Sequence, residues 1–149
     1  MKIGDPAPDI ALQTDSGASL KLSRLRGKKV VLFFYPRANT PGCTIEACEF
    51  RDTSKQFTRK GAVVIGISPD TVQSQAGFKS KFDLPYDLLA DVDKSAAQAF
   101  GVWREKNMYG KKVMGIVRST FVIDEKGKIA KIYDKVTAKG HAEAVLAAL

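Results

Sequence analysis

The chain has 149 residues, with 24 Lys and Arg against 16 Asp and Glu, a formal charge of +8, and 44% hydrophobic residues. This length and composition predict one globular domain, residues 1–149, and exclude extended disorder. The basic residues are spread over most segments without a nucleic-acid-binding motif, so we expect no nucleic-acid partner. The longest obvious apolar run, 30–35, is too short to span a bilayer, so we expect no membrane partner.

The first half of the chain alternates turn-forming clusters with apolar segments. The pattern predicts these elements in order: an antiparallel hairpin of strands 9–12 and 19–22, a short helical turn capped by Ser23, a buried strand at 29–35, a helix from Cys43 to near Gly61, and a second buried strand at 62–68. The strand, helix and strand from 29 to 68 predict a right-handed βαβ unit.

The second half continues in the same mixed order. It predicts a helix at 71–82, a short strand at 86–89, a helix capped by Asp93 and closed by Gly101, a polar loop at 104–115, a hairpin of strands 117–123 and 128–133, and a last helix from about Lys139. The predicted fold class is therefore α/β, a central mixed sheet with helices on both faces and an N-terminal β-hairpin.

The stretch from Tyr35 to Cys48 connects the first buried strand to its helix. Prolines, an asparagine and a glycine form its turn, and Cys43 should lie in the first turn of the helix. The unpaired N–H groups there and the macrodipole favour an anion, so a thiol loses its proton more easily than in a free cysteine. The alternative is that Cys43 is a small buried hydrophobe.

Several motifs together carry a family resemblance. They are Tyr35-Pro36, Thr40-Pro41-Gly42-Cys43-Thr44, Glu46-Ala47-Cys48, Gly101-Val102-Trp103 and the segment Arg118 to Asp124. Over essentially the whole chain these residues strongly resemble a peroxiredoxin of the Q-type, or bacterioferritin comigratory protein, subgroup. The resemblance implies a thioredoxin-like fold and a thiol-dependent peroxidase that reduces hydrogen peroxide and organic hydroperoxides.

The same resemblance implies roles for individual residues. Cys43 would be the peroxidatic cysteine and Cys48 the resolving one, while Pro36, Thr40 and Arg118 would complete the peroxide pocket. A thioredoxin-like protein would reduce the resulting disulfide. Without the resemblance, Arg118 would be expected as a solvated arginine, Thr40 as a loop hydroxyl bonded to its own backbone, and Pro36 as a strand terminator. Ala38 departs from the acidic residue that many relatives carry at this place.

The spacing of the two cysteines restricts their chemistry. In a regular helix residues five apart have Cα atoms roughly 8.7 Å apart, whereas a disulfide usually needs about 4.4–6.8 Å. We therefore predict that the start of the helix unwinds before Cys43 and Cys48 can bond. The alternative for Cys48 is a core cysteine, in which case another thiol would resolve Cys43.

Rival functions share the fold but differ in chemistry. A general thiol–disulfide oxidoreductase should carry a C-x-x-C pair, which is missing here, and a redox sensor using the same disulfide stays an alternative. Two cysteines and His141, expected on the surface, make a poor zinc site, and no haem or flavin signature appears, so no metal or cofactor is implied. With no signal-peptide segment and two cysteines, we expect a cytoplasmic protein. We also expect a monomer.

Overall fold

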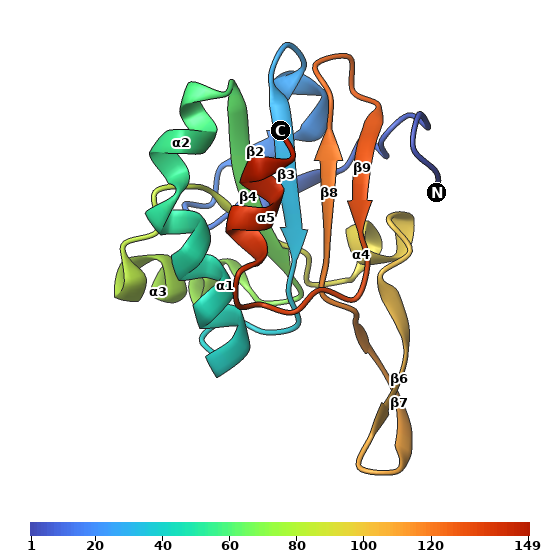
Figure 1. Ribbon diagram of the computed structural model, residues 1–149. Helices are drawn as coiled ribbons and strands as arrows, with labels where there is room; N and C mark the ends of the chain where they lie inside the picture. Colours follow the sequence, from blue (N-terminus) through green and yellow to red (C-terminus); the bar gives the residue numbers. More distant parts are fainter.

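The computed structural model describes residues 1–149 as a seven-stranded sheet with helices on both faces and a separate two-stranded ribbon (Figure 1). The strands are β1 (Ala11–Thr14), β2 (Ser19–Lys21), β3 (Lys29–Phe34), β4 (Ala62–Ser68), β5 (Leu88–Ala90), β6 (Trp103–Met108), β7 (Lys111–Ile116), β8 (Ser119–Ile123) and β9 (Ile129–Tyr133). The helices are the 3-10 turn η1 (Leu22–Leu25), α1 (Pro41–Asp52), α2 (Ser54–Arg59), α3 (Val72–Phe82), α4 (Ser95–Ala99) and α5 (His141–Ala147).

The sheet is mixed, with the strand order β2-β1-β5-β4-β3-β8-β9. Strands β3, β4 and β5 run parallel, and β1 and β8 pair antiparallel with β5 and β3. The predicted βαβ unit is present, since β4 lies beside β3 after α1 and α2. Both central strands are continuous apolar runs because their two faces are covered, as is usual for parallel strands.

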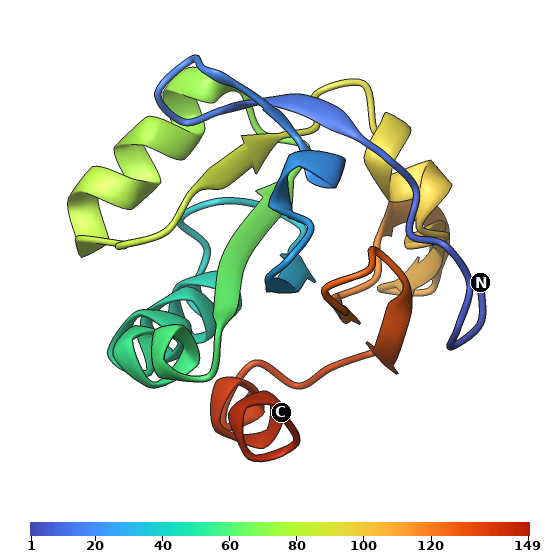
Figure 2. The same cartoon turned by 90° about the horizontal axis from the view of Figure 1, so that it is seen from above.

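Alternate residues of β3 and its end supply the two cores. Val31, Phe33 and Tyr35 point into a cluster with side chains of α1, α2, α3 and α5, whereas Leu32 and Phe34 join a second cluster with η1 and α4. Figure 2 shows α5 and the α1–α2 pair on one side of the sheet and α4 on the other. The predicted layering, a mixed sheet covered on both faces, is confirmed.

The helix predicted from Cys43 to Gly61 is interrupted. α1 ends at Asp52 and α2 begins at Ser54, with Thr53 between them outside regular helix geometry. The Thr53 hydroxyl donates to the carbonyl of Glu49 at 2.8 Å, a side-chain bond that competes with the backbone pattern and often bends helices. The apolar periodicity that predicted one helix continues across the break, which is why the pattern did not reveal it.

The polar loop predicted at 104–115 is wrong. This segment forms β6 and β7, an antiparallel ribbon that projects from the body at the lower right of Figure 1. Tyr109 and Gly110 both have positive φ, 53° and 79°, as a type I′ hairpin turn requires. Lysines and glycines masked the strand pattern, because the ribbon is largely exposed and needs no apolar face.

Other differences concern the capping of the helices and the bounds of the strands. Ser23 lies inside η1, and its N–H donates to the Asp9 carboxylate at 2.9 Å instead of capping the turn. At the start of α4 the predicted Asp93 accepts from the N–H of Ser95 at 3.1 Å, and Asp91 adds a second carboxylate whose two oxygens accept from the N–H groups of Ala96 and Ala97. The strands of the first hairpin and of β5 are shifted by one or two residues from the predicted ranges.

None of the helices is both long enough and apolar enough to cross a lipid bilayer.

Candidate active site

Cys43 lies in the first turn of α1, as the sequence predicts. Thr40 occupies the N-cap with extended backbone, Pro41 is the first helical residue, and the N–H of Thr44 makes the first helical bond, to the Thr40 carbonyl. The N–H groups of Gly42 and Cys43 therefore belong to the free donors of a helix start, where the macrodipole favours negative charge. Cys43 is 2% exposed, so its sulfur is held within the fold.

Arg118 is brought to this cysteine by strand pairing. β8 runs antiparallel to β3 with Ser119 opposite Phe34, which places the preceding Arg118 at the end of β3 where the chain turns toward α1. Its Nη2 donates to Cys43 Sγ at 3.2 Å. Gly42 permits this approach, since a Cβ at that position would lie 3.2 Å from Nη2. The side chain of Arg118 is 16% exposed, so the arginine is not a solvated surface residue.

Glu46 is the third member of this cluster, and sequence reasoning gave it no role. Its Oε1 accepts from Arg118 Nη1 at 2.7 Å, and the side chain is completely buried. Burial raises the pKa of Glu46 to about 7, although Arg118 acts in the opposite direction. Its other oxygen, Oε2, has no hydrogen-bond partner. The spacing of Glu46 could have identified it from the sequence, because a residue three places after Cys43 lies on the same face of the helix as Cys43.

The guanidinium of Arg118 therefore bridges a sulfur and a carboxylate. Burial works to lower the pKa of Arg118, but the negative charges of Glu46 and Cys43 outweigh it and raise the pKa. The guanidinium stays charged, and its planar set of donors suits two acceptors at once. The cluster can thus stabilise negative charge at the Cys43 sulfur or on an atom bound next to it.

Thr40 and Pro36 lie in the loop beside the cysteine. Thr40 Oγ1 donates to the carbonyl of Arg37 at 2.8 Å, as expected of a loop hydroxyl bonded to the local backbone, and makes no hydrogen bond to Cys43. The lone pairs of Oγ1 remain available to accept a hydrogen bond. Pro36 directly follows Tyr35 at the end of β3 and is half-buried.

A buried polar chain holds this loop in place. The N–H of Ala38 donates to the Asp70 carboxylate at 2.7 Å, and Asp70 also accepts from Ser68 Oγ at 2.6 Å. Gln75 joins the chain by donating to Ser68 Oγ at 2.7 Å and accepting from the hydroxyl of Tyr35 at 2.5 Å. Ala38 therefore anchors the loop through its backbone, which a change of side chain does not remove.

Cys48 lies on the same helix, and both cysteines are free thiols. α1 is continuous from Pro41 to Asp52, so the regular-helix distance between the two Cα atoms applies, roughly 8.7 Å. Cys48 is half-buried, and one residue before it the Ala47 carbonyl accepts from the hydroxyl of Tyr86 at 2.6 Å. The second cysteine is near in sequence but outside disulfide range in this conformation.

The expectation that His141 lies on the surface is wrong. It is 5% exposed, lies 2.7 Å from Thr120 Oγ1 through Nε2, and packs edge-on against the rings of Phe50 and Tyr133. Burial, followed by the charge of Arg118, lowers the pKa of His141 to about 4. The imidazole is therefore neutral near pH 7 and fixes the start of α5 against the sheet and α1.

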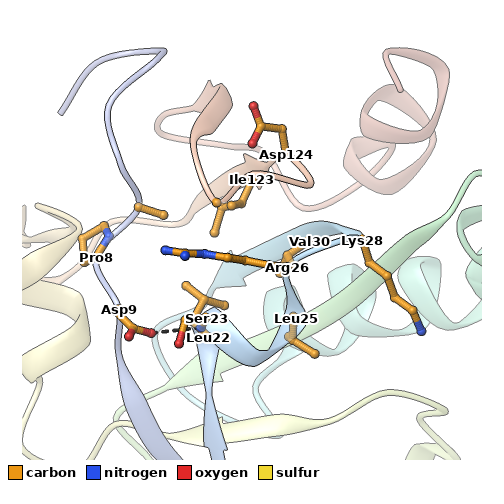
Figure 3. A pocket seen from close by; sticks show the side chains of 12 residues that line it. Pro8, Asp9, Leu22, Ser23, Leu25, Arg26, Lys28, Val30, Ile123 and Asp124 are labelled. Carbon is orange, nitrogen blue, oxygen red and sulfur yellow. Dashed lines mark hydrogen bonds between the residues drawn. The ribbon is translucent and has the colours of Figure 1, made fainter.

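One hollow at the opposite end of the sheet is too small for a ligand. Figure 3 shows a hollow beside the start of β3, where the Arg26 side chain reaches across between Pro8 and Ile123. Its volume of about 20 Å³ corresponds to about one water molecule. No group of three or more His, Cys, Asp or Glu side chains is arranged to hold a metal ion.

Comparisons with known proteins point to one family. A sequence profile of the AhpC/TSA family matches residues 3–132. The chain is 47% identical to a putative peroxiredoxin bcp of Coxiella burnetii, an alignment that covers all of this chain and 99% of the relative. It is also 47% identical to peroxiredoxin Bcp of Bacillus subtilis, with coverage of 100% and 95%.

Solved structures agree with this match. A cysteine-to-serine mutant of Xylella fastidiosa PrxQ has a TM-score of 0.94 at 37% identity and covers 99% of this chain and 94% of its own. The bacterioferritin comigratory protein of Xanthomonas campestris, described for its alkyl peroxide reduction activity, has a TM-score of 0.89 at 40% identity, with coverage of 93% and 88%. The expected thioredoxin-like fold is confirmed.

Proposed function

Because this chain belongs to the AhpC/TSA family and matches Bcp peroxiredoxins over its full length, we propose that Cys43 is the thiol with which it reduces hydroperoxides. Membership of this family supports a thiol-dependent peroxidase. The observation that carries the assignment to Cys43 is its contact with Arg118, a buried cation that lies against the sulfur at the start of a helix.

In the proposed reaction the Cys43 thiolate attacks one peroxide oxygen along the O–O axis. The sulfur–oxygen bond forms as the oxygen–oxygen bond breaks, and the second oxygen leaves as hydroxide or alkoxide and takes a proton. Cys43 is thereby oxidised to a sulfenic acid and the peroxide is reduced to water or an alcohol. Arg118 stabilises the charge that passes from sulfur to the leaving oxygen, as donors aimed at developing charge do.

Thr40 and Pro36 support this step from the loop. The free lone pairs of Thr40 Oγ1 can accept the hydrogen bond of a hydroperoxide O–H and so orient the O–O bond. Pro36 adds a rigid, donor-free wall to the pocket. The polar chain ending at Asp70 keeps both residues in place relative to the helix start.

Cys48 then resolves the sulfenic acid. Its sulfur attacks Cys43 Sγ, water leaves, and an intramolecular disulfide forms. Since the intact α1 keeps the two Cα atoms too far apart, the first turn must unwind after Cys43 is oxidised. A thioredoxin-like dithiol protein then reduces the exposed disulfide by thiol–disulfide exchange and is itself oxidised.

The proposal extends to the setting of the reaction. We take the 149 residues to form one thioredoxin-like domain that acts as a monomer in the cytoplasm, on hydrogen peroxide and organic hydroperoxides, without a nucleic-acid or membrane partner.

The test compares wild type with Cys43→Ser and Cys48→Ser in two assays. A rapid-mixing assay follows the first turnover with hydrogen peroxide and with an organic hydroperoxide, and a coupled assay follows NADPH oxidation through thioredoxin and its reductase. Cys43→Ser should lose both activities, whereas Cys48→Ser should keep the first turnover and lose the coupled one.

Other outcomes would contradict defined parts of the proposal. Wild-type peroxide consumption in Cys43→Ser would remove the assigned function. Full coupled turnover in Cys48→Ser would show that another thiol resolves Cys43 and that Cys48 is a core residue. Coupled turnover that stays slow in wild type under excess reductant would indicate a redox sensor, and insulin reduction without peroxide consumption a general oxidoreductase.

A further inference from the structure

The ribbon of β6 and β7 leaves the sheet at the end where the candidate active site lies. Ser119, the first residue of β8, is paired with Phe34, the last residue of β3, and the chain after β3 leads to Cys43. Because β7 ends just before β8, the ribbon and the start of α1 lie at the same end of the sheet (Figure 1). A protein that approaches Cys43 from this end therefore has the ribbon beside it.

The ribbon carries a large share of the exposed apolar side chains of the protein. Eight large apolar side chains are exposed in the whole chain, and four of them, Met108, Tyr109, Val113 and Met114, lie on the ribbon. Tyr109 at the tip is fully exposed. Single exposed apolar residues need no explanation, whereas several that gather on one element are typical of an interaction surface.

One face of the ribbon combines apolar and basic side chains. Residues that are paired across two strands, or that lie two apart along one strand, share a face. The register therefore places Lys106, Met108, Lys111 and Val113 on the same face, which we call the basic ribbon face. This face carries positive charge and no carboxylate.

The opposite face is neutral and partly covered. Glu105 and Lys112 both lie on it and approach to 3.8 Å, so this lysine has an acidic neighbour. At the base of the same face Trp103 and Ile116 pack with the second core cluster, which lies on the side of the sheet that α4 covers (Figure 2). The base of the basic ribbon face is therefore turned toward the other side of the sheet, which carries α1 and Cys43.

The charge of the basic ribbon face selects among possible partners. A second copy of the chain would bring Lys106 and Lys111 against the same cations, and each chain has a formal charge of +8, so pairing through this face is opposed. An acidic protein surface complements the face, and opposite charges speed association. In the proposed reaction, the protein that has to reach this end is the dithiol that reduces the Cys43–Cys48 disulfide.

We propose that the basic ribbon face, with Tyr109 at its tip, is the docking surface for this dithiol protein, and that the partner carries carboxylates around its cysteine pair. The inference rests on the proposed function. A thiolate of the docked partner attacks one sulfur of the Cys43–Cys48 disulfide and releases the other, and the second thiolate of the partner then attacks the first and releases the remaining cysteine. Cys43 and Cys48 gain two electrons and two protons, and the two thiols of the partner become a disulfide.

The test compares matched substitutions on the two faces of the ribbon. Lys111→Glu and Met108→Ser alter the basic ribbon face, whereas Lys112→Glu and Met114→Ser make the same changes on the opposite face. The two methionines are 49% and 51% exposed, and both lysines are exposed. In the assay coupled through thioredoxin and its reductase, Lys111→Glu and Met108→Ser should each raise the KM for thioredoxin by about threefold to tenfold. The two control variants should keep the KM near the wild-type value.

Further readouts separate docking from chemistry and folding. Dithiothreitol is small and needs no docking surface, so all four variants should keep the wild-type peroxidase rate when it replaces thioredoxin. The first turnover in rapid mixing should also be unchanged. Added salt should raise the KM of wild type for thioredoxin and narrow its difference from Lys111→Glu, because salt screens exposed charges.

Several outcomes would overturn the inference. The KM for thioredoxin could be unchanged in all four variants, or it could rise equally for both faces, which would make the effect one of net charge or overall polarity. Self-association in analytical ultracentrifugation, or sedimentation with anionic phospholipid vesicles, that Met108→Ser abolishes without a change in KM would assign the face to a second copy or to a bilayer.

Failure of the docking inference can be distinguished from failure of the proposed function. Wild type that turns over with dithiothreitol but not with thioredoxin would overturn the docking surface and leave Cys43 as the peroxidase thiol. Unchanged peroxide consumption in Cys43→Ser would instead remove the proposed function, whatever the ribbon variants do.

Discussion

Replacing Glu46 with Gln should change how the stability of the protein depends on pH. Glu46 is completely buried, and its pKa is raised from its ordinary value of 4.5 to about 7, chiefly by burial. Gln keeps the shape and an oxygen that can accept from Arg118 but cannot ionise. At about 1.4 kcal/mol per pH unit, the interval from 4.5 to about 7 corresponds to about 3 kcal/mol of unfolding free energy.

The direction follows from proton binding. Between pH 4.5 and about 7 the folded state keeps a proton on Glu46 that the unfolded state has released, so the unfolding free energy of wild type falls as the pH rises. Glu46→Gln lacks this loss. The unfolding free energy of the variant minus that of wild type should therefore rise by about 3 kcal/mol between pH 4 and pH 8.

The assay is urea unfolding followed by circular dichroism at five pH values from 4 to 8. The difference between the two proteins must be used because His141 titrates over an overlapping range with the opposite sign, which flattens the wild-type curve. Glu125→Gln, at an exposed carboxylate, is the matched control and should show no such rise. A difference in unfolding free energy that stays constant from pH 4 to pH 8 would refute the conclusion that burial raises the pKa of Glu46.

Three further changes test other parts of the structure. The pKa of His141 is lowered to about 4, so its contribution to the unfolding free energy should be lost as the pH falls from 6.5 to about 4. Urea unfolding should show that wild type loses about 3 kcal/mol relative to His141→Gln over this range, and curves of free energy against pH that stay parallel would contradict this. Tyr86→Phe removes the hydrogen bond to the carbonyl of Ala47, which lies between the two cysteines, and should lower the unfolding free energy by about 1 kcal/mol. Disulfide formation after a peroxide pulse should become faster, and an unchanged rate would argue against unwinding of this part of α1. Gly66→Ala would place a Cβ 2.8 Å from Leu88 Cδ2 in the core and should lower the urea-unfolding free energy by about 1–3 kcal/mol, whereas no loss would show that the core can adjust.

Elements with a strong local pattern could be predicted from the sequence. The apolar runs that became β3 and β4, and the turn residues before Cys43, predicted two buried strands and a cysteine in the first turn of a helix. These predictions hold because strand alternation, proline and glycine geometry and helix starts depend on neighbours within a few residues. The roles of Arg118 and Thr40 came instead from a family resemblance.

Where local pattern and tertiary context disagreed, context prevailed. The segment 104–115 reads as a polar loop because its charged side chains hide strand character, but pairing of β6 with β7 makes it a ribbon. His141 reads as a surface residue, yet docking of α5 buries it against Phe50 and Tyr133. The single helix expected to Gly61 is interrupted at Thr53, whose hydroxyl donates to the Glu49 carbonyl, and the apolar periodicity does not encode this interruption.

The chain by itself determined that a cysteine stands at a helix start, since that depends on the residues on either side of it. Only the tertiary structure decided what charge surrounds the sulfur. Arg118 lies 75 residues from Cys43 and reaches it because β8 pairs with β3. Burial then decides the proton affinity of Glu46, because the cost of desolvating a carboxylate depends on everything packed around it.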